Sequence, residues 1–272
     1  MLNVRGMSRT ALMTDIFRKP KGPKQCAFCW EKANLTQEHL WSAWIGRSFE
    51  AKSYKFRHKN PDGSIRMWRG SELNSKAKVV CAKCNNGWMS NLESSSIPIL
   101  KDMILHGRET VLSRSDIAIM AAVTFKNSII ADHIQNYRLP YFAFKERKLF
   151  SETLTIPFGI QMWIGSKVGH DGIFKSYYAR TPAGTPNGFE ALVFTYGVGH
   201  LIVQCTSARP TRKVLRRHAA EFPFTQDWVW DRLAVPFWPS NGPTMKWPHF
   251  SHMGDEVVDQ FVRRWEDARI TF

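Results

Sequence analysis

The residues with the clearest chemical potential lie in the first third of the chain. Cys26 and Cys29 form one C-x2-C pair, and Cys81 and Cys84 form a second. Two such pairs supply the four thiolates that a structural Zn²⁺ ion takes in tetrahedral geometry, and in a reducing compartment this spacing favours a metal over disulfides. We therefore predict one structural zinc ion on these four cysteines. Cys205 follows an apolar run and is predicted to be a buried core thiol.

Between the two pairs an acidic residue stands next to a histidine, Glu38-His39. Metal-dependent phosphodiester hydrolysis needs a carboxylate for a hard cation and a base that activates water, and the pKa of histidine suits the second role. Asn85 follows Cys84 directly, and its carbonyl oxygen could complete the cation site. An isolated Glu-His pair is more often solvated polarity, so the cysteine pairs give this one its weight. A second acidic-histidine pair, Asp132-His133, lacks such a frame and is interpreted as structural.

The stretch CAFC…TQEHLWSAWI…VVCAKCNNGWMSNLE resembles the four-cysteine subgroup of HNH (ββα-metal) endonucleases and looks similar in layout to phage endonuclease VII. The resemblance covers about a quarter of the chain. It implies that His39 is the general base, that Glu38 and Asn85 hold a catalytic Mg²⁺ or Mn²⁺, and that the four cysteines hold zinc. The family usually has Asp at the position of Glu38. Asn74 is the candidate for the residue that orients the base, and Asn86 is an alternative to Asn85.

The formal net charge of +15 is unevenly distributed. Residues 1–90 hold 17 basic and 6 acidic side chains, a net of +11, whereas the remaining residues hold 21 and 17, a net of +4. A basic field gathered on one segment indicates a polyanionic partner, most often nucleic acid. The side chains predicted to contact nucleic acid are Lys55, Arg57, Lys59, Arg66, Arg69 and Lys83.

Local patterns predict an α+β fold, a zinc-stapled ββα-metal module followed by a mixed helical and antiparallel-sheet region. Alternating runs at 53–59 and 64–70 flank the turn sequence Asn60-Pro61-Asp62-Gly63 and predict a hairpin. A strand at 76–80 precedes the second cysteine pair. Helices are predicted from residue 85 to before Pro98, from Pro98 to His106 before Gly107, and from an N-cap at Ser115 to residue 134. Further strands are predicted at 155–165 and 174–180, a hairpin at 188–205, and an amphipathic helix at 254–270.

These patterns suggest three parts: a basic leader (1–25), a nuclease module (26–110) and an accessory β-rich region (111–272). We expect a metal-dependent endonuclease acting on DNA, in phage defence or a mobile element. We expect it in the cytoplasm, because the chain shows no apolar signal core and no apolar run long enough to cross a bilayer. Whether the substrate is DNA or RNA stays open. One alternative is a zinc-stabilised nucleic-acid-binding protein without catalysis. Another is a nuclease controlled by a protein partner or a small molecule bound to the C-terminal region.

Overall fold

The fold is described from a computed structural model of the chain. The structure describes residues 25–40, 42–49, 54–59, 65–70, 76–135, 139–168, 174–180, 189–210, 233–249 and 252–263. The fold is mixed α and β, and every pair of strands in the described part is antiparallel, as the sequence predicts.

The two cysteine pairs are joined by a two-stranded sheet that leads into a helix. Strand β1 (Leu35–His39) pairs antiparallel with β4 (Lys76–Cys81). The chain then passes through the short helix α3 (Ala82–Cys84) and the π-helical turn η1 (Asn85–Met89) into α4 (Ser90–His106). Gly87 has non-helical backbone angles and kinks the chain at the start of this helix. Two paired strands followed by a helix give the ββα arrangement predicted for this region, with a short helix and a hairpin (residues 43–70) inserted between the two strands.

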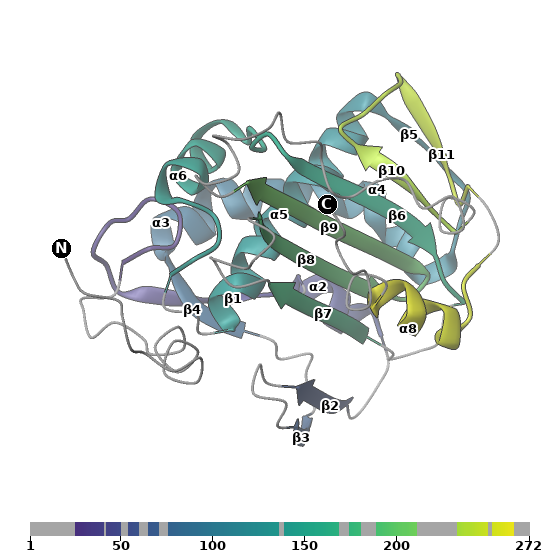
Figure 1. Ribbon diagram of the computed structural model, residues 1–272, viewed down its shortest axis with the longest axis horizontal. Helices are drawn as coiled ribbons and strands as arrows, with labels where there is room; N and C mark the ends of the chain where they lie inside the picture. Colours follow the sequence, from purple (N-terminus) through teal and green to yellow (C-terminus); the bar gives the residue numbers. More distant parts are fainter. Residues whose placement is uncertain are drawn as a thin grey trace.

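A separate hairpin is formed by β2 (Tyr54–Lys59) and β3 (Ile65–Gly70), as the alternating pattern predicts. It is a two-stranded sheet of its own that extends from the body of the molecule in Figure 1. The register places Lys55 opposite Arg69. The short helix α2 (Ala43–Ser48) lies between β1 and this hairpin in the sequence.

Helix α5 (Arg114–Ile134) forms the centre of the fold and is buried along most of its length. By length and composition it could cross a membrane, because its most apolar stretch has a mean hydropathy of 1.3. However, 78% of that stretch is buried inside the protein. The expectation that no apolar run is long enough to cross a bilayer is therefore wrong for this helix. Its burial is typical of the core helix of a globular protein.

A five-stranded sheet lies against α5, with strand order β10-β6-β9-β8-β7 (Figure 1). Its strands are β6 (Ile160–Ser166), β7 (Phe174–Arg180), β8 (Phe189–Val198), β9 (Leu201–Pro210) and β10 (Ala234–Trp238). Residues 191–198 of β8 are all buried, and because alternate residues of a strand point to opposite faces, both faces of the sheet are covered at this strand. On β8, Phe194 and Tyr196 belong to the core that contains α5, whereas Val193 belongs to a second cluster with Phe261 of the C-terminal helix α8 (Asp255–Arg263).

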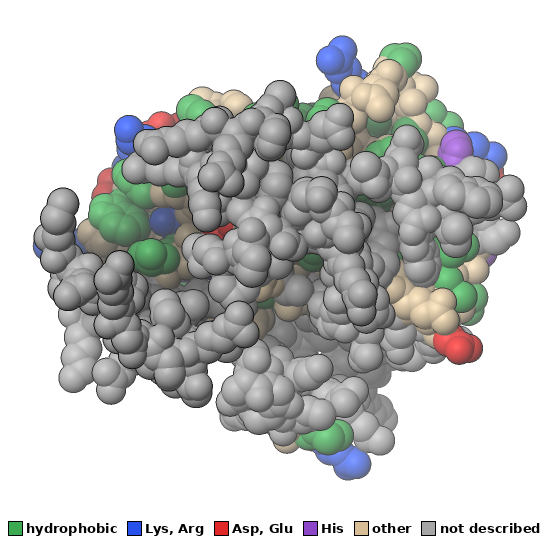
Figure 2. All heavy atoms as spheres, in the orientation of Figure 1, with side chains coloured by type: hydrophobic (Ala, Val, Ile, Leu, Met, Phe, Trp, Pro, Cys, Tyr) green, Lys and Arg blue, Asp and Glu red, His purple; other side chains and the backbone are tan. Residues whose placement is uncertain are grey.

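The remaining elements complete the same core. They are α6 (Phe144–Thr153), β5 (Thr110–Ser113) and β11 (Thr244–Trp247), the last two paired with each other. One cluster of buried residues includes Phe28, Leu112, Phe150 and Trp247, so a single core extends across residue 110. Hydrophobic side chains reach the surface at the end of the molecule that carries α6 in Figure 2, and Leu149 and Leu154 are among the exposed ones.

Two predicted helix boundaries are wrong. Helix α4 continues through Pro98, although proline removes one backbone hydrogen bond, because buried residues on both sides of it, such as Leu92 and Leu100, pack on the same core. The N-cap of α5 is Ser113 and not Ser115: Ser113 Oγ accepts from the Asp116 N–H at 3.2 Å and the Asp116 carboxylate accepts from the Ser113 N–H at 2.9 Å. This capping box satisfies two backbone donors, which a cap at Ser115 would not.

Candidate zinc and catalytic centre

The first knuckle, Cys26 to Cys29, is a tight turn held by backbone hydrogen bonds. The Trp30 N–H donates to the Cys26 carbonyl at 3.1 Å, and the Cys26 N–H donates to the Glu31 carbonyl at 3.0 Å. Trp30 has a φ of 67°, a left-handed conformation that is strained for a residue with a side chain. This turn directs both thiols of the knuckle to the same side.

The second knuckle, Cys81 to Cys84, is the junction between β4 and the helix. Cys81 is the N-cap of α3, and its sulfur accepts the Cys84 N–H at 3.5 Å. The Cys81 N–H in turn points at Cys26 Sγ, at 3.4 Å. Backbone N–H groups directed at sulfur stabilise thiolates, and such contacts commonly surround metal-bound cysteines.

The four cysteine sulfur atoms all lie within 4.8 Å of one another, and Cys29 Sγ is 3.6 Å from Cys81 Sγ. A tetrahedral zinc ion with Zn–S bonds of about 2.3 Å requires sulfur atoms about 3.8 Å apart. Three of the cysteines are buried and Cys29 is half-buried. The donor set, the spacing and the burial therefore fit the predicted structural zinc site.

The thiols of this cluster differ in pKa. Hydrogen bonding from Cys84, together with backbone N–H groups, lowers the pKa of Cys26 to about 4. The pKa of Cys84 is raised, first because it shares that hydrogen bond and then because it is buried. Burial raises the pKa of Cys29 to about 11. The protein alone thus stabilises one thiolate, and a bound dication would supply the positive charge needed to ionise all four.

Aromatic rings pack the zinc cluster against the C-terminal half of the chain. The Phe28 ring, inside the first knuckle, meets Trp88 edge to face at a centroid distance of 5.0 Å, and Trp88 meets Phe150 at 5.5 Å. Phe150 of α6 also contacts Phe125 of α5 at 4.8 Å. Trp88 therefore packs around the zinc cluster, and it does so together with two helices that lie outside the predicted nuclease module.

Arg147 of α6 connects the C-terminal half of the chain to the first knuckle by a hydrogen bond. Its side chain is buried, donates through Nε to the Phe142 carbonyl at 3.0 Å, and donates through Nη1 to the Ala27 carbonyl. Burial lowers the pKa of the Arg147 guanidinium. The guanidinium also lies 5.7 Å from the Trp30 ring centroid. Arg147 and Ala27 are 120 positions apart, so the residue pattern contains no signal for their contact.

The Glu-His pair ends a strand whose pairing is irregular. The register of β1 and β4 shifts after Thr36, so Val79 of β4 has no partner across the sheet, and its carbonyl accepts the Ala27 N–H at 2.8 Å. On β1 the buried residues are Leu35 and Glu38, three apart and not two. Residues three apart on a strand lie on opposite faces, so β1 is covered on both faces and Glu38 points into the protein interior.

Glu38 forms a buried ion pair with a residue of α5. Its Oε1 atom lies 2.7 Å from Lys126 Nζ, and only 8% and 4% of the two side chains are exposed. Glu93 on α4 is close to this pair: burial is the main cause that raises the pKa of Glu93, the Lys126 charge opposes the rise and the Glu38 charge adds to it. Neither Lys126 nor Glu93 was among the residues predicted from the sequence.

Two of the other predicted catalytic residues, His39 and Asn85, are described near Glu38. His39 is half-buried at the end of β1. Asn85, also half-buried, donates through Nδ2 to Thr36 Oγ1 at 3.0 Å and to the Gln37 carbonyl at 3.3 Å. The amide thus reaches back from the helix to β1, and Oδ1 is its atom outside these two bonds. The oxygens of Glu38 and Asn85 are the ligand type that a hard cation such as Mg²⁺ takes, so the residues fit the predicted cation chemically.

The remaining predicted residues are only partly described. Arg69 and Lys83 are exposed, and Lys83 lies 3.7 Å from Glu31. Asn86 is exposed beside Asn85. Asn74, the hairpin turn and the leader up to residue 24 lie outside the described residues, as do the side chains of Lys55, Arg57, Lys59 and Arg66.

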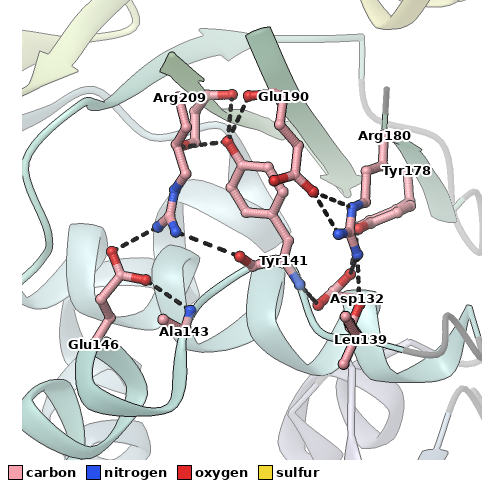
Figure 3. A network of polar contacts seen from close by, with 10 residues as sticks. Asp132, Leu139, Tyr141, Ala143, Glu146, Tyr178, Arg180, Glu190 and Arg209 are labelled. Atoms are coloured by element: carbon pink, nitrogen blue, oxygen red, sulfur yellow. Dashed lines mark hydrogen bonds and ion pairs between the residues drawn. The ribbon is translucent and has the colours of Figure 1, made fainter. Parts of the chain in front are cut away.

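Asp132, the acidic residue of the second acidic-histidine pair, belongs to a network of polar contacts (Figure 3), and His133 Nδ1 lies 2.8 Å from the Ile129 carbonyl in its own helix. Asp132 is buried and accepts hydrogen bonds from the Tyr141 N–H at 2.7 Å and from the Tyr178 hydroxyl. Arg180 pairs with both Asp132 and Glu190. In Figure 3 the Tyr141 ring lies between this cluster and Arg209, whose guanidinium is 4.7 Å from the ring centroid. Each charge here has a partner within the network, which fixes the chain between α5 and α6.

Cys205 is fully buried, as predicted, and burial raises its pKa to about 12. The thiol is therefore a packing element of β9 and not a nucleophile.

Comparison of the chain with protein-family models, with curated proteins and with solved structures found no match.

Proposed function

We propose that this protein is a divalent-metal-dependent nuclease whose active site is built on the zinc-stapled ββα region. One observation carries the proposal. Glu38 and His39 end the strand that pairs with β4, and β4 leads through the second knuckle to Asn85, whose side chain reaches back to the first strand. A carboxylate, an imidazole and an amide oxygen are thus carried by the β1–β4 sheet and the helix that follows it, and the four-cysteine cluster connects these elements.

The residues of the chain have distinct roles in this proposal. Glu38 and Asn85 would hold the cation through their side-chain oxygens, and a bound divalent cation supplies neutralisation of the charge on the scissile phosphate and the departing oxygen. His39 would take a proton from the attacking water. Its half-exposed position at the end of β1 is compatible with contact to solvent, and the pKa of a histidine suits a base near neutral pH.

The charge distribution favours nucleic acid as the substrate. The net charge of residues 1–90 is +11, and Arg69 and Lys83 are exposed on the same part of the chain. Binding through such side chains is directed mainly at phosphates, so it would depend little on sequence and weaken steeply with salt. DNA is the substrate we expect, and RNA is tested beside it.

A second candidate function is a zinc-stabilised nucleic-acid-binding protein without catalysis. The observation that favours it is the buried ion pair between Glu38 and Lys126, because a carboxylate already neutralised by an ammonium can be explained as part of the core. In that case the basic residues would still bind nucleic acid, and no divalent cation would be needed.

The experiment that separates the two is cleavage of supercoiled plasmid and of labelled RNA by the zinc-loaded protein in EDTA, Mg²⁺ or Mn²⁺. Wild-type protein should nick in Mg²⁺ or Mn²⁺ and not in EDTA, and His39→Ala should lose at least about 100-fold of the rate while keeping its zinc and its affinity for DNA. His106→Ala, which changes an exposed histidine at the end of α4, serves as the matched control. Equal nicking by wild type and His39→Ala would remove the assigned base. Tight DNA binding without cleavage in any cation would favour the second candidate.

A further inference from the structure

One contact that the sequence patterns do not predict joins the proposed catalytic carboxylate of Glu38 to Lys126. The two residues are 88 positions apart, and Lys126 belongs to α5, outside the predicted nuclease module. Glu38 points toward this helix, and its Oε1 atom lies 2.7 Å from the Lys126 ammonium. The pairing thus joins the two halves of the chain at the residue on which the proposed chemistry depends.

The surroundings of this pair contain a second carboxylate. Glu93 of α4 interacts electrostatically with both Lys126 and Glu38, and it is hydrogen-bonded to Ser42, with Arg47 as a further nearby charge. Lys126 is therefore a buried cation that interacts with two carboxylates. A divalent ion would compensate the negative charge of these carboxylates in the same way as the Lys126 ammonium does.

We propose that Lys126 is a positioning residue for the nuclease site: it holds the Glu38 carboxylate in place when no divalent cation is bound, and it competes with that cation for Glu38. This inference rests on the proposed function, because it takes Glu38 as a cation ligand. An ammonium and a divalent ion on one carboxylate repel each other strongly at these distances, even at the effective dielectric constant of a protein interior. The cation must therefore displace the ammonium or bind more weakly beside it.

The competition predicts an order of cation affinities that a purely structural ion pair does not. Lys126→Met removes the competing charge, so Mn²⁺ should bind at least about tenfold more tightly than to wild type. Lys126→Arg keeps the charge, and its planar guanidinium can cover both carboxylate oxygens, so Mn²⁺ should bind at least about threefold more weakly. Lys148→Met removes the same charge from an exposed pair with Glu152 and should leave the affinity unchanged.

Mn²⁺ is the probe, titrated by calorimetry and by the electron paramagnetic resonance signal of the free ion, with zinc saturating throughout. Circular dichroism and zinc content verify that each variant is folded. If Lys126→Met does not fold, the Lys126→Arg result and the double variant Glu38→Gln/Lys126→Met decide. The double variant replaces the ion pair by a neutral pair and should lose the Mn²⁺ site.

Mn²⁺ affinity that is unchanged or lower in Lys126→Met, or unchanged or higher in Lys126→Arg, would overturn the inference. So would Mn²⁺ binding that survives in the double variant. The outcomes for the proposed function are distinct. If the affinities follow the predicted order but no nucleic acid is cleaved, the cation site stands and the nuclease proposal fails. If His39-dependent nicking is found without this order, the nuclease proposal stands and the role of Lys126 fails.

Discussion

The contact of Arg147 with the first knuckle allows a worked prediction about how the C-terminal half supports the zinc site. In Arg147→Met the side chain keeps much of its volume but cannot donate to the carbonyls of Ala27 and Phe142, both of which lose a buried donor. A buried acceptor without a partner costs about 1–3 kcal/mol, so the two together cost about 2–6 kcal/mol. Part of this loss is offset because a guanidinium no longer has to be buried. We expect a net loss of about 3 kcal/mol in the free energy of unfolding.

Urea unfolding of the zinc-loaded variants, followed by circular dichroism, measures this loss directly. Zinc release to a colorimetric chelator should also be faster in Arg147→Met, because the first knuckle loses a contact that holds its backbone. Arg108→Met is the matched control: Arg108 is exposed and pairs with Asp102 at the surface, so its loss should cost less than about 1 kcal/mol. A loss of stability in Arg147→Met no larger than that in Arg108→Met, with zinc released at the wild-type rate, would contradict this prediction.

Three further predictions follow from the core. With zinc bound, none of the five thiols should react with a chromogenic disulfide at pH 8; a chelator should make four of them reactive, and Cys205 should react only in denaturant. Burial raises the pKa of Cys205 in the folded protein to about 12. The stability that comes from keeping this thiol protonated is therefore full below the pKa of an unfolded thiol, about 8.5, and is lost as the pH rises toward 12. Early reaction of Cys205 would contradict this. Ser113→Ala removes the side-chain acceptor of the capping box and should cost about 1 kcal/mol in urea unfolding, whereas Ser115→Ala should cost clearly less. Gly199→Ala should cost at least about 2 kcal/mol, because Gly199 has a φ of 54° and an added Cβ would lie 2.0 Å from the Ile104 carbonyl oxygen; an unchanged melting temperature would rule out this close approach.

Local patterns were sufficient to predict most of the elements. The alternating runs predicted the β2–β3 hairpin, the glycine-containing turn predicted the β8–β9 hairpin, and the C-x2-C spacing predicted that the two knuckles meet. In each case the information lies within neighbouring residues or in a residue type with one dominant chemistry. The wrong end of the helix at Pro98 shows the limit of such patterns, because packing on both sides of a proline can outweigh the lost hydrogen bond.

The contacts that surround the candidate site could not be predicted in this way. Lys126 lies in a helix whose apolar residues predict a core element, and a lysine in such a helix would be expected at the surface. Its burial is compensated by Glu38, the buried carboxylate with which it forms an ion pair. The contact between Arg147 and Ala27 likewise depends on how α6 packs against the first knuckle. Both are properties of the tertiary fold and leave no local pattern in the sequence.

The predicted division at residue 110 is relevant to any attempt to isolate the nuclease region. The single core across this position contains Phe125 and Phe150, which pack toward the first knuckle, and Lys126 neutralises Glu38. A fragment ending at residue 110 would lose all three side chains. The full chain is therefore the form in which activity should be measured.

Plasmid nicking by wild type and His39→Ala in Mn²⁺ tests most directly the proposal that Glu38 and His39 form the active site of a metal-dependent nuclease. We expect that wild-type protein nicks the plasmid, that EDTA stops it, and that His39→Ala, with its zinc and its DNA affinity intact, is at least about 100-fold slower. Nicking by His39→Ala at the wild-type rate would contradict this assignment.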